Sequence, residues 1–117
     1  MIDRRKRGAE GEDLAVEYLR RLGYTIRRRN YRYHRGEIDI IAQNGETLVF
    51  VEVKTRRSTA FGDPEEAVTP LKGRRIRRIA AGFLLEENIG DRECRFDVIG
   101  VDYARGSPAL RHIENAF

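Results

Sequence analysis

The stretch GEIDIIAQNGETLVFVEVK, residues 36–54, decides the fold of this 117-residue chain. Two runs rich in β-branched and apolar residues flank Asn44-Gly45, and an Asn-Gly pair between such runs predicts a β-hairpin with a two-residue type I′ turn. That turn sets a register in which Asp39 lies diagonal to Glu52, with Cα atoms roughly 7–8 Å apart. The hairpin therefore predicts two carboxylates close together in a sheet.

The acidic residues of this hairpin share a face with a lysine. Because side chains alternate along a strand, Asp39, Glu52 and Lys54 are predicted to point to the same side of the sheet, while three valines fill the other side. Charged groups in a strand covered on both faces need a partner or a metal ion. The pattern predicts a site for one divalent cation. The alternative is a structural ion pair between Lys54 and either carboxylate.

Composition and charge limit the class of protein. The chain is 40% hydrophobic and 36% charged, and its length predicts one globular domain, 1–117, in which residues 1–8 form a basic arm. One cysteine, Cys94, excludes an internal disulfide and is typical of a reducing compartment. We expect neither a signal peptide nor a membrane span, since no run approaches 18 apolar residues. The expected location is the cytoplasm.

The basic residues favour a polyanionic partner. Lys and Arg number 23 against 19 Asp and Glu, and only three of the 23 are lysines, which leaves 20 arginines. Arginine is the better bidentate ligand for phosphate. The alternative explanation is a GC-rich genome, whose codons would give the same bias toward arginine.

A helix is expected from about Ala9 to Leu22, because apolar residues recur at helical spacing and Gly23 follows as a cap. Glu12 lies in the middle of the apolar arc of this helix. One interpretation is that Glu12 is a third acidic group directed toward the sheet. The other is that it is a first-turn glutamate favoured by the helix dipole.

The remaining elements predict an α/β (α+β) fold. A strand is expected over residues 24–33, and a second helix begins with Thr69 as N-cap and Pro70 in its first position. Lys72 projects along the buried stripe of this helix, where it either reaches past the edge of the core or faces the site. Further strands are expected over 95–101 and 110–113.

Several motifs resemble known families. GAEGEDLAVEYLRRLGY, RGEIDIIA, LVFVEVKTR and FGDPEEAVTPLKGRRI are similar, along nearly the whole chain, to the YraN family of small, largely uncharacterised bacterial proteins. Glu12, then Asp39, then Glu52-Val53-Lys54 resembles the PD-(D/E)xK nuclease superfamily, within which the pattern is similar to Holliday-junction resolvases. The resemblance implies a restriction-endonuclease-like αβββαβ core, with a central mixed sheet flanked by helices.

The resemblance also implies roles for residues. Asp39 and Glu52 would hold Mg²⁺ or Mn²⁺, with the backbone carbonyl of Val53 as a further ligand and Glu12 as an additional acid, directly or through water. Lys54 would position or activate the attacking water and stabilise charge on the phosphate. Such a metal site is suited to phosphodiester hydrolysis.

Three functions are consistent with these residues. The first is a divalent-metal-dependent endonuclease acting on DNA, including branched or junction DNA, as a homodimer by analogy with the resolvases. The second is a nucleic-acid-binding module on a nuclease fold that does not cleave, and the third is a protein-assembly subunit. The expected nucleic-acid-binding residues are Arg28, Arg56, Arg57, Lys72 and Arg75.

Overall fold

The computed structural model describes residues 4–56, 68–103 and 106–117. In these residues the chain forms two helices and five strands: α1 (Arg4–Arg21), β1 (Thr25–Tyr33), β2 (Gly36–Asn44), β3 (Thr47–Arg56), α2 (Pro70–Glu86), β4 (Cys94–Asp102) and β5 (Ala109–Ile113).

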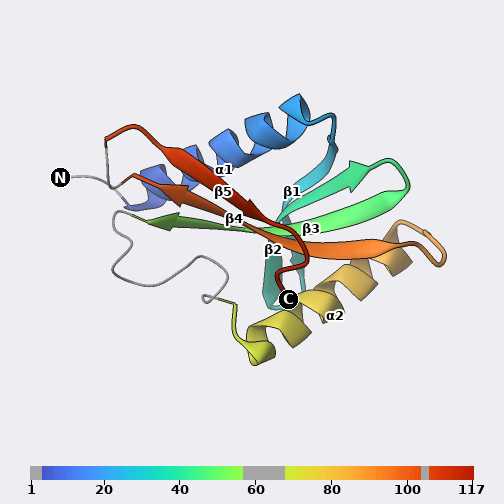
Figure 1. The fold of residues 1–117 in the computed structure, drawn as a ribbon. Helices are drawn as coiled ribbons and strands as arrows, with labels where there is room; N and C mark the ends of the chain where they lie inside the picture. The colour runs from blue at the N-terminus through green and yellow to red at the C-terminus, as the bar shows by residue number, and fades with distance from the viewer. Residues whose placement is uncertain (1–3, 57–67, 104–105) are drawn as a thin grey trace.

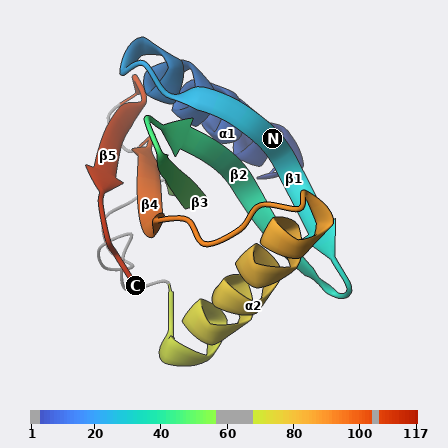
Figure 2. The ribbon, with the colours of Figure 1, turned by 90° about the vertical axis from the view of Figure 1, so that its right-hand side faces the viewer.

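The strands form one mixed sheet in the order β1-β2-β3-β4-β5. Neighbouring strands are antiparallel except β3 and β4, which are parallel and lie on either side of α2 in the sequence. Figures 1 and 2 show α1 on one face of the sheet and α2 on the other. The prediction of a mixed sheet flanked by helices is confirmed, and the architecture is compatible with a restriction-endonuclease-like core.

Each face of the sheet has its own apolar core. The core beneath α1 contains Ala15, Val16, Leu19, Tyr24, Ile40, Ala42, Val49, Val51, Ile99 and Val101. The core beneath α2 contains Ile38, Ile41, Leu48, Phe50, Ile76, Ile79, Ala80, Phe83 and Phe96. The central strands are therefore covered on both sides, and a charged side chain among them is shielded from water.

The helix boundaries partly match the expectations. Thr69 is the N-cap of α2, its side chain accepts a hydrogen bond from the Lys72 backbone N–H at 3.2 Å, and Pro70 begins the helix, as predicted. Helix α1 begins at Arg4 and not near Ala9, so residues 4–8 of the expected basic arm are helical. In the described parts of the chain, no helix is both long and apolar enough to cross a bilayer.

The predicted hairpin turn is wrong by one position. The β2–β3 ladder pairs Asn44 with Thr47, so the two turn residues are Gly45 and Glu46. Gly45 has a φ of 62°, and glycine in the first turn position is typical of a type II′ turn. The Gln43 side chain supports this turn by donating a hydrogen bond to the Gly45 carbonyl at 2.8 Å.

The correction shifts the register by two residues. The last pair of the ladder joins Ile40 to Val51, so Asp39 and Glu52 come next on their strands, opposite each other and not diagonal as predicted. A shift of two residues keeps every side chain of β3 on its predicted face, because strands alternate with period two.

A buried ionic network secures β5 to the rest of the sheet. Asp97 is fully buried, and its carboxylate accepts hydrogen bonds from Arg95 Nη2 at 2.8 Å and the Asn115 backbone N–H at 3.1 Å. His112 Nε2 lies 2.7 Å from the same carboxylate, and its Nδ1 lies 3.1 Å from the Tyr18 hydroxyl of α1. Burial alone would raise the pKa of Asp97, but the hydrogen bonds from His112 and Arg95 outweigh burial and lower it. Its role is structural.

We expect Asp97→Asn to reduce the free energy of unfolding by about 3 kcal/mol at pH 7, because it removes the nearer counter-charge of the partly buried Arg95 and leaves only Glu114, at 3.6 Å. The folded-state pKa of Asp97 lies below its ordinary value of 3.8, so this stabilisation is present above that pH and is lost as the pH falls further. Urea unfolding measures both effects. The exposed Asp91→Asn is the control, and equal losses in the two variants would contradict the structural role.

Candidate active site

Strand β2 changes face at Asp39. Ile38 packs beneath α2 and Ile40 beneath α1, although simple alternation would place both on one side. Asn30, which lies across from Asp39 in β1, has a left-handed backbone with a φ of 51°. This local twist places Asp39 where side chains from both layers can approach it.

The Asp39 side chain also links β2 to β3 just beyond the end of their backbone pairing. The backbone pairing ends at Ile40 and Val51, and two residues later the Val53 N–H donates a hydrogen bond of 2.8 Å to Asp39 Oδ2. The carboxylate therefore fixes the spacing of the two strands at this point and satisfies an N–H that the ladder no longer pairs. The side chain of Asp39 is tied to the backbone between Glu52 and Lys54.

Glu52 is the second strand acid, and it is 6% exposed. Its Oε2 lies 3.6 Å from Lys72 Nζ, while its Oε1 is buried and has no hydrogen-bond partner among the described residues. A buried carboxylate oxygen without a partner is energetically costly and is a common sign of an absent ion or ligand.

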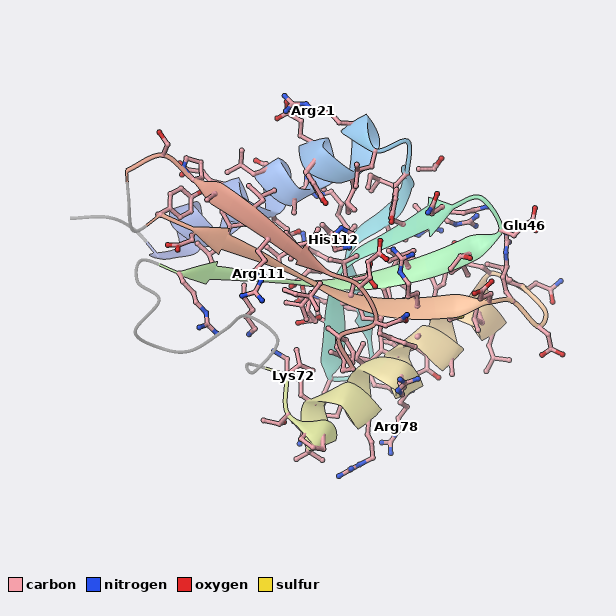
Figure 3. The ribbon with its side chains drawn as sticks, in the orientation of Figure 1. Arg21, Glu46, Lys72, Arg78, Arg111 and His112 are labelled. Atoms are coloured by element: carbon pink, nitrogen blue, oxygen red, sulfur yellow. The ribbon has the colours of Figure 1, made fainter. Side chains whose placement is uncertain are left out.

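Lys72 reaches this site from the first turn of α2 (Figure 3). It also approaches Lys54 closely, and a hydrogen bond with Lys72, together with burial and charge repulsion, lowers the pKa of Lys54. Of the two interpretations of Lys72, the structure supports the one in which it faces the site. Two lysines thus adjoin two strand carboxylates.

Glu12 comes to the site from α1. A Cβ atom at Gly11 would lie 2.3 Å from Thr55 Oγ1, so glycine allows the helix to approach β3 closely at this point. Glu12 is 15% exposed at its side chain, lies 3.7 Å from Arg29 Nη2 and has one buried oxygen without a hydrogen bond among the described residues. Asn30 also hydrogen-bonds to its side chain.

Asp39 raises the proton affinity of the other two acids. Burial and then repulsion from Asp39 raise the pKa of Glu52 to about 7. Burial is also the main reason that the pKa of Asp39 is raised, with the Val53 hydrogen bond acting in the opposite direction. The pKa of Glu12 is raised by burial and by Asp39. The acids therefore form one electrostatic unit that favours added positive charge.

The donor set limits how a cation would be held. In residues 4–56, 68–103 and 106–117, no three His, Cys, Asp or Glu side chains converge closely enough to hold a metal ion. Asp39 and Glu52 would therefore be the direct side-chain ligands, and Glu12 would act through water. Mg²⁺ retains several waters when it is bound by few carboxylates, so the residues present fit such an ion.

The expected nucleic-acid-binding residues are dispersed. Lys72 lies in the site, and Arg75 follows one turn later on α2, where it lines a cavity. Arg28 forms an ion pair with Glu87 beyond the far end of α2. Arg56 is half-buried at the end of β3, and Arg57 lies outside the described residues.

Sequence reasoning missed Asn30. It contacts Glu12 and stands at the twist that orients Asp39. Asparagine tolerates left-handed backbone better than most residues, so an Asn inside an arginine-rich strand was the available signal.

The fold and this cluster define a small mixed α/β domain with a buried site of carboxylates and lysines. The profile of the uncharacterised protein family UPF0102 matches residues 11–101. The chain belongs to this family, which is the YraN-like group that its motifs resemble.

Similar bacterial proteins match this chain over most of their length. A UPF0102 protein of Alkaliphilus oremlandii is 52% identical over 115 residues, which cover 97% of this chain and 98% of the relative. A UPF0102 protein of Geobacter sulfurreducens is 50% identical over 111 residues, which cover 94% of this chain and 87% of the relative. One from Rhodococcus opacus is 48% identical over 111 residues, covering 94% of each chain.

We expect Glu52→Gln to stabilise the metal-free protein by about 1–3 kcal/mol at pH 8 and to have little effect at pH 4.5. Because the folded-state pKa is raised from 4.5 to about 7, the folded protein resists ionisation of Glu52, and the penalty is complete only above pH 7. Urea unfolding in EDTA at both pH values measures the difference. The exposed Glu46→Gln is the matched control, and a gain for Glu52→Gln that does not change with pH would contradict the assignment.

Proposed function

We propose that this protein is an endonuclease that hydrolyses phosphodiester bonds of DNA with the help of Mg²⁺ or Mn²⁺. One observation carries the proposal: Glu52 is buried opposite Asp39 with an oxygen that lacks a hydrogen bond among the described residues, and both carboxyl groups have raised pKa values. Lys72 compensates only part of this charge, because its Nζ lies 3.6 Å from Glu52 Oε2 and its side chain is 35% exposed to water. A divalent cation would satisfy both the charge and the free oxygen.

Asp39 and Glu52 would hold the cation, the Val53 carbonyl would complete the strand-borne ligands, and Glu12 would bind one of its waters. When bound, the cation would supply Lewis acidity and a bound water of lowered pKa. The hydrogen bond from the Val53 N–H keeps Asp39 oriented before any ligand arrives. The chain therefore provides preorganised ligands on rigid strands.

The lysines act on the proton and on the phosphate charge. The lowered pKa of Lys54 brings it closer to neutrality than an isolated lysine, so it can accept a hydrogen bond from, or take a proton from, a water beside the carboxylates. Lys72 keeps the pKa of Lys54 low and offers a second positive charge. Either ammonium group would stabilise the negative charge that develops on the phosphoryl oxygens.

The substrate follows from the charge around the site. Arg75 lies one turn beyond Lys72 on α2 and faces solvent, so a DNA backbone can reach both residues. We extend the proposal to branched DNA and to a homodimer, because a two-fold enzyme could cut two strands of a junction. We also extend it to a cytoplasmic location, because a single cysteine is typical of a reducing compartment.

A non-catalytic DNA-binding module is the second candidate. It is favoured by the arginines around α2, which need no metal ion to bind phosphate. Such a module would show affinity that falls with salt and would not depend on Asp39.

We expect Asp39→Asn to abolish Mg²⁺-dependent cleavage, because it removes a ligand of the cation. We expect Lys54→Met to lower the single-turnover rate by at least about 100-fold, because it removes the amine beside the reacting phosphate. Single-turnover cleavage of a panel of duplex, flap and junction DNAs measures the rate of each variant. DNA binding is measured separately in EDTA. Lys54→Met should bind DNA nearly as wild type does.

Arg20→Gln on the exposed face of α1 is the control for loss of one positive charge. An undiminished single-turnover rate in Asp39→Asn or Lys54→Met would contradict the assignment of that residue. A wild-type protein that binds DNA and does not cleave any member of the panel would favour the binding module.

A further inference from the structure

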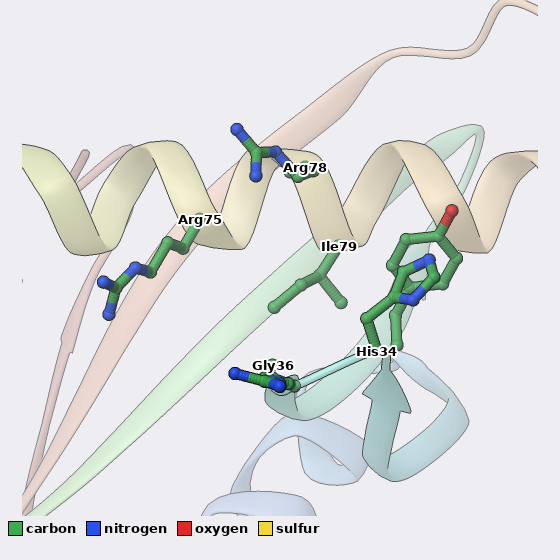
Figure 4. A pocket seen from close by; sticks show the side chains of 7 residues that line it. His34, Gly36, Arg75, Arg78 and Ile79 are labelled. Atoms are coloured by element: carbon green, nitrogen blue, oxygen red, sulfur yellow. The ribbon is translucent and has the colours of Figure 1, made fainter.

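A cavity of about 630 Å³ opens between α2 and the turn that joins β1 to β2 (Figure 4). Ile79 points from α2 toward Gly36, and a Cβ atom at Gly36 would lie 2.3 Å from Ile79 Cδ1. Gly36 and Ile79 form the apolar part of the cavity lining, and a larger residue at position 36 would clash with Ile79. The volume is within the range that holds a drug-sized ligand, and a single nucleotide is of that size.

Two aromatic rings form one wall of this cavity. Tyr33 is packed against Gly82, where an added Cβ would lie 2.5 Å from the tyrosine ring. The His34 ring meets Tyr33 edge-on, with centroids 4.4 Å apart. His34 is exposed and has a left-handed φ of 55°, so the turn holds its ring at the cavity rim. Such rings provide a stacking surface for a base.

Three arginines, Arg35, Arg75 and Arg78, surround the apolar surface. In the described parts of the chain none of them has an ion-pair or hydrogen-bond partner, whereas arginines of α1 and β1 pair with carboxylates. Among the residues that the structure describes, no acidic side chain lines the cavity. The combination of guanidinium groups, an apolar surface and aromatic rings fits a ligand that is both anionic and planar.

The cavity adjoins the candidate active site. Gly36 precedes Asp39 by three residues on β2, a distance of about 10 Å along a strand. Arg75 follows Lys72 by nearly one turn of α2, about 5 Å along the helix axis. One DNA strand could therefore contact both places.

We infer that this cavity binds an unpaired nucleotide of the DNA substrate, with its base against Tyr33, His34 and Ile79 and its phosphate at the arginines. The inference rests on the proposed function and adds a substrate class: DNA with an unpaired segment beside the phosphate to be cut. In a continuous duplex both faces of each base are covered by its neighbours, and extruding a base costs a few kcal/mol. An unpaired base enters without that cost.

Fluorescence anisotropy in EDTA tests the inference without cleavage. The probes are a blunt duplex and the same duplex with a single-stranded tail. We expect wild type to bind the tailed DNA at least about fivefold more tightly at fixed salt, and His34→Asn and Arg75→Gln to bring this ratio close to one. Asparagine at position 34 tolerates the left-handed backbone, so the first variant removes the ring without straining the turn.

Arg74→Gln is the matched control, because Arg74 is an exposed neighbour on the same helix and does not line the cavity. It should weaken binding of both DNAs equally and leave the ratio unchanged. Equal ratios in wild type and in both cavity variants would overturn the inference. A competition experiment gives a second test, with free deoxyadenosine monophosphate and a single-stranded oligonucleotide as competitors of the tailed DNA. If both displace the tailed DNA at the same concentration, the cavity is a site for free nucleotides and the inference is overturned.

The cleavage assay separates this inference from the proposed function. Cleavage that requires Asp39, without any preference for the tailed DNA, would overturn only the inference. A preference that depends on His34 and Arg75, in a protein that does not cut DNA, would overturn only the nuclease proposal.

Discussion

The hydrogen bond from the Val53 N–H to the Asp39 carboxylate is the interaction on which the site depends. It forms where the β2–β3 ladder ends, so a side chain takes over the pairing of two strands from the backbone. The same point is where β2 changes face, and this twist makes Asp39 accessible to acids and lysines from both layers. A carboxylate used in this way is held rigidly, and its position relative to Glu52 is set by the sheet itself.

The cluster is electrostatically unfavourable by itself. Glu52 is nearly inaccessible to water, its neighbour Asp39 raises its pKa, and Lys72 compensates it incompletely. Buried ionic groups that serve only stability are usually paired, as Asp97 is with Arg95 and His112 on the other side of the sheet. The contrast between these two buried acids within one domain argues that the site around Glu52 is kept for binding and not for folding.

The sequence predicted much of the fold, because alternation in the hairpin, the Thr69-Pro70 helix start and the Gly23 cap are local signals with local causes. It also predicted that Asp39 and Glu52 would meet. The turn position was wrong because Asn44-Gly45 and Gly45-Glu46 are both feasible turns, and the Gln43 side chain and the ladder decide between them. The approach of Lys72 to Lys54 and the cavity beneath α2 depend on how the helix packs on the sheet, which no short motif specifies.

The central claim is that the acids at the β2–β3 junction bind a divalent cation. Its most direct test is isothermal titration of Mg²⁺ and Mn²⁺ into wild type and Asp39→Asn at pH 6.5. Wild type should bind a cation at one site and release protons as it does so, since the pKa of Glu52 is about 7. Titration in two buffers of different ionisation enthalpy measures that release. Asp39→Asn should bind neither ion detectably. Absence of binding in wild type, or equal binding by the two proteins, would contradict the account.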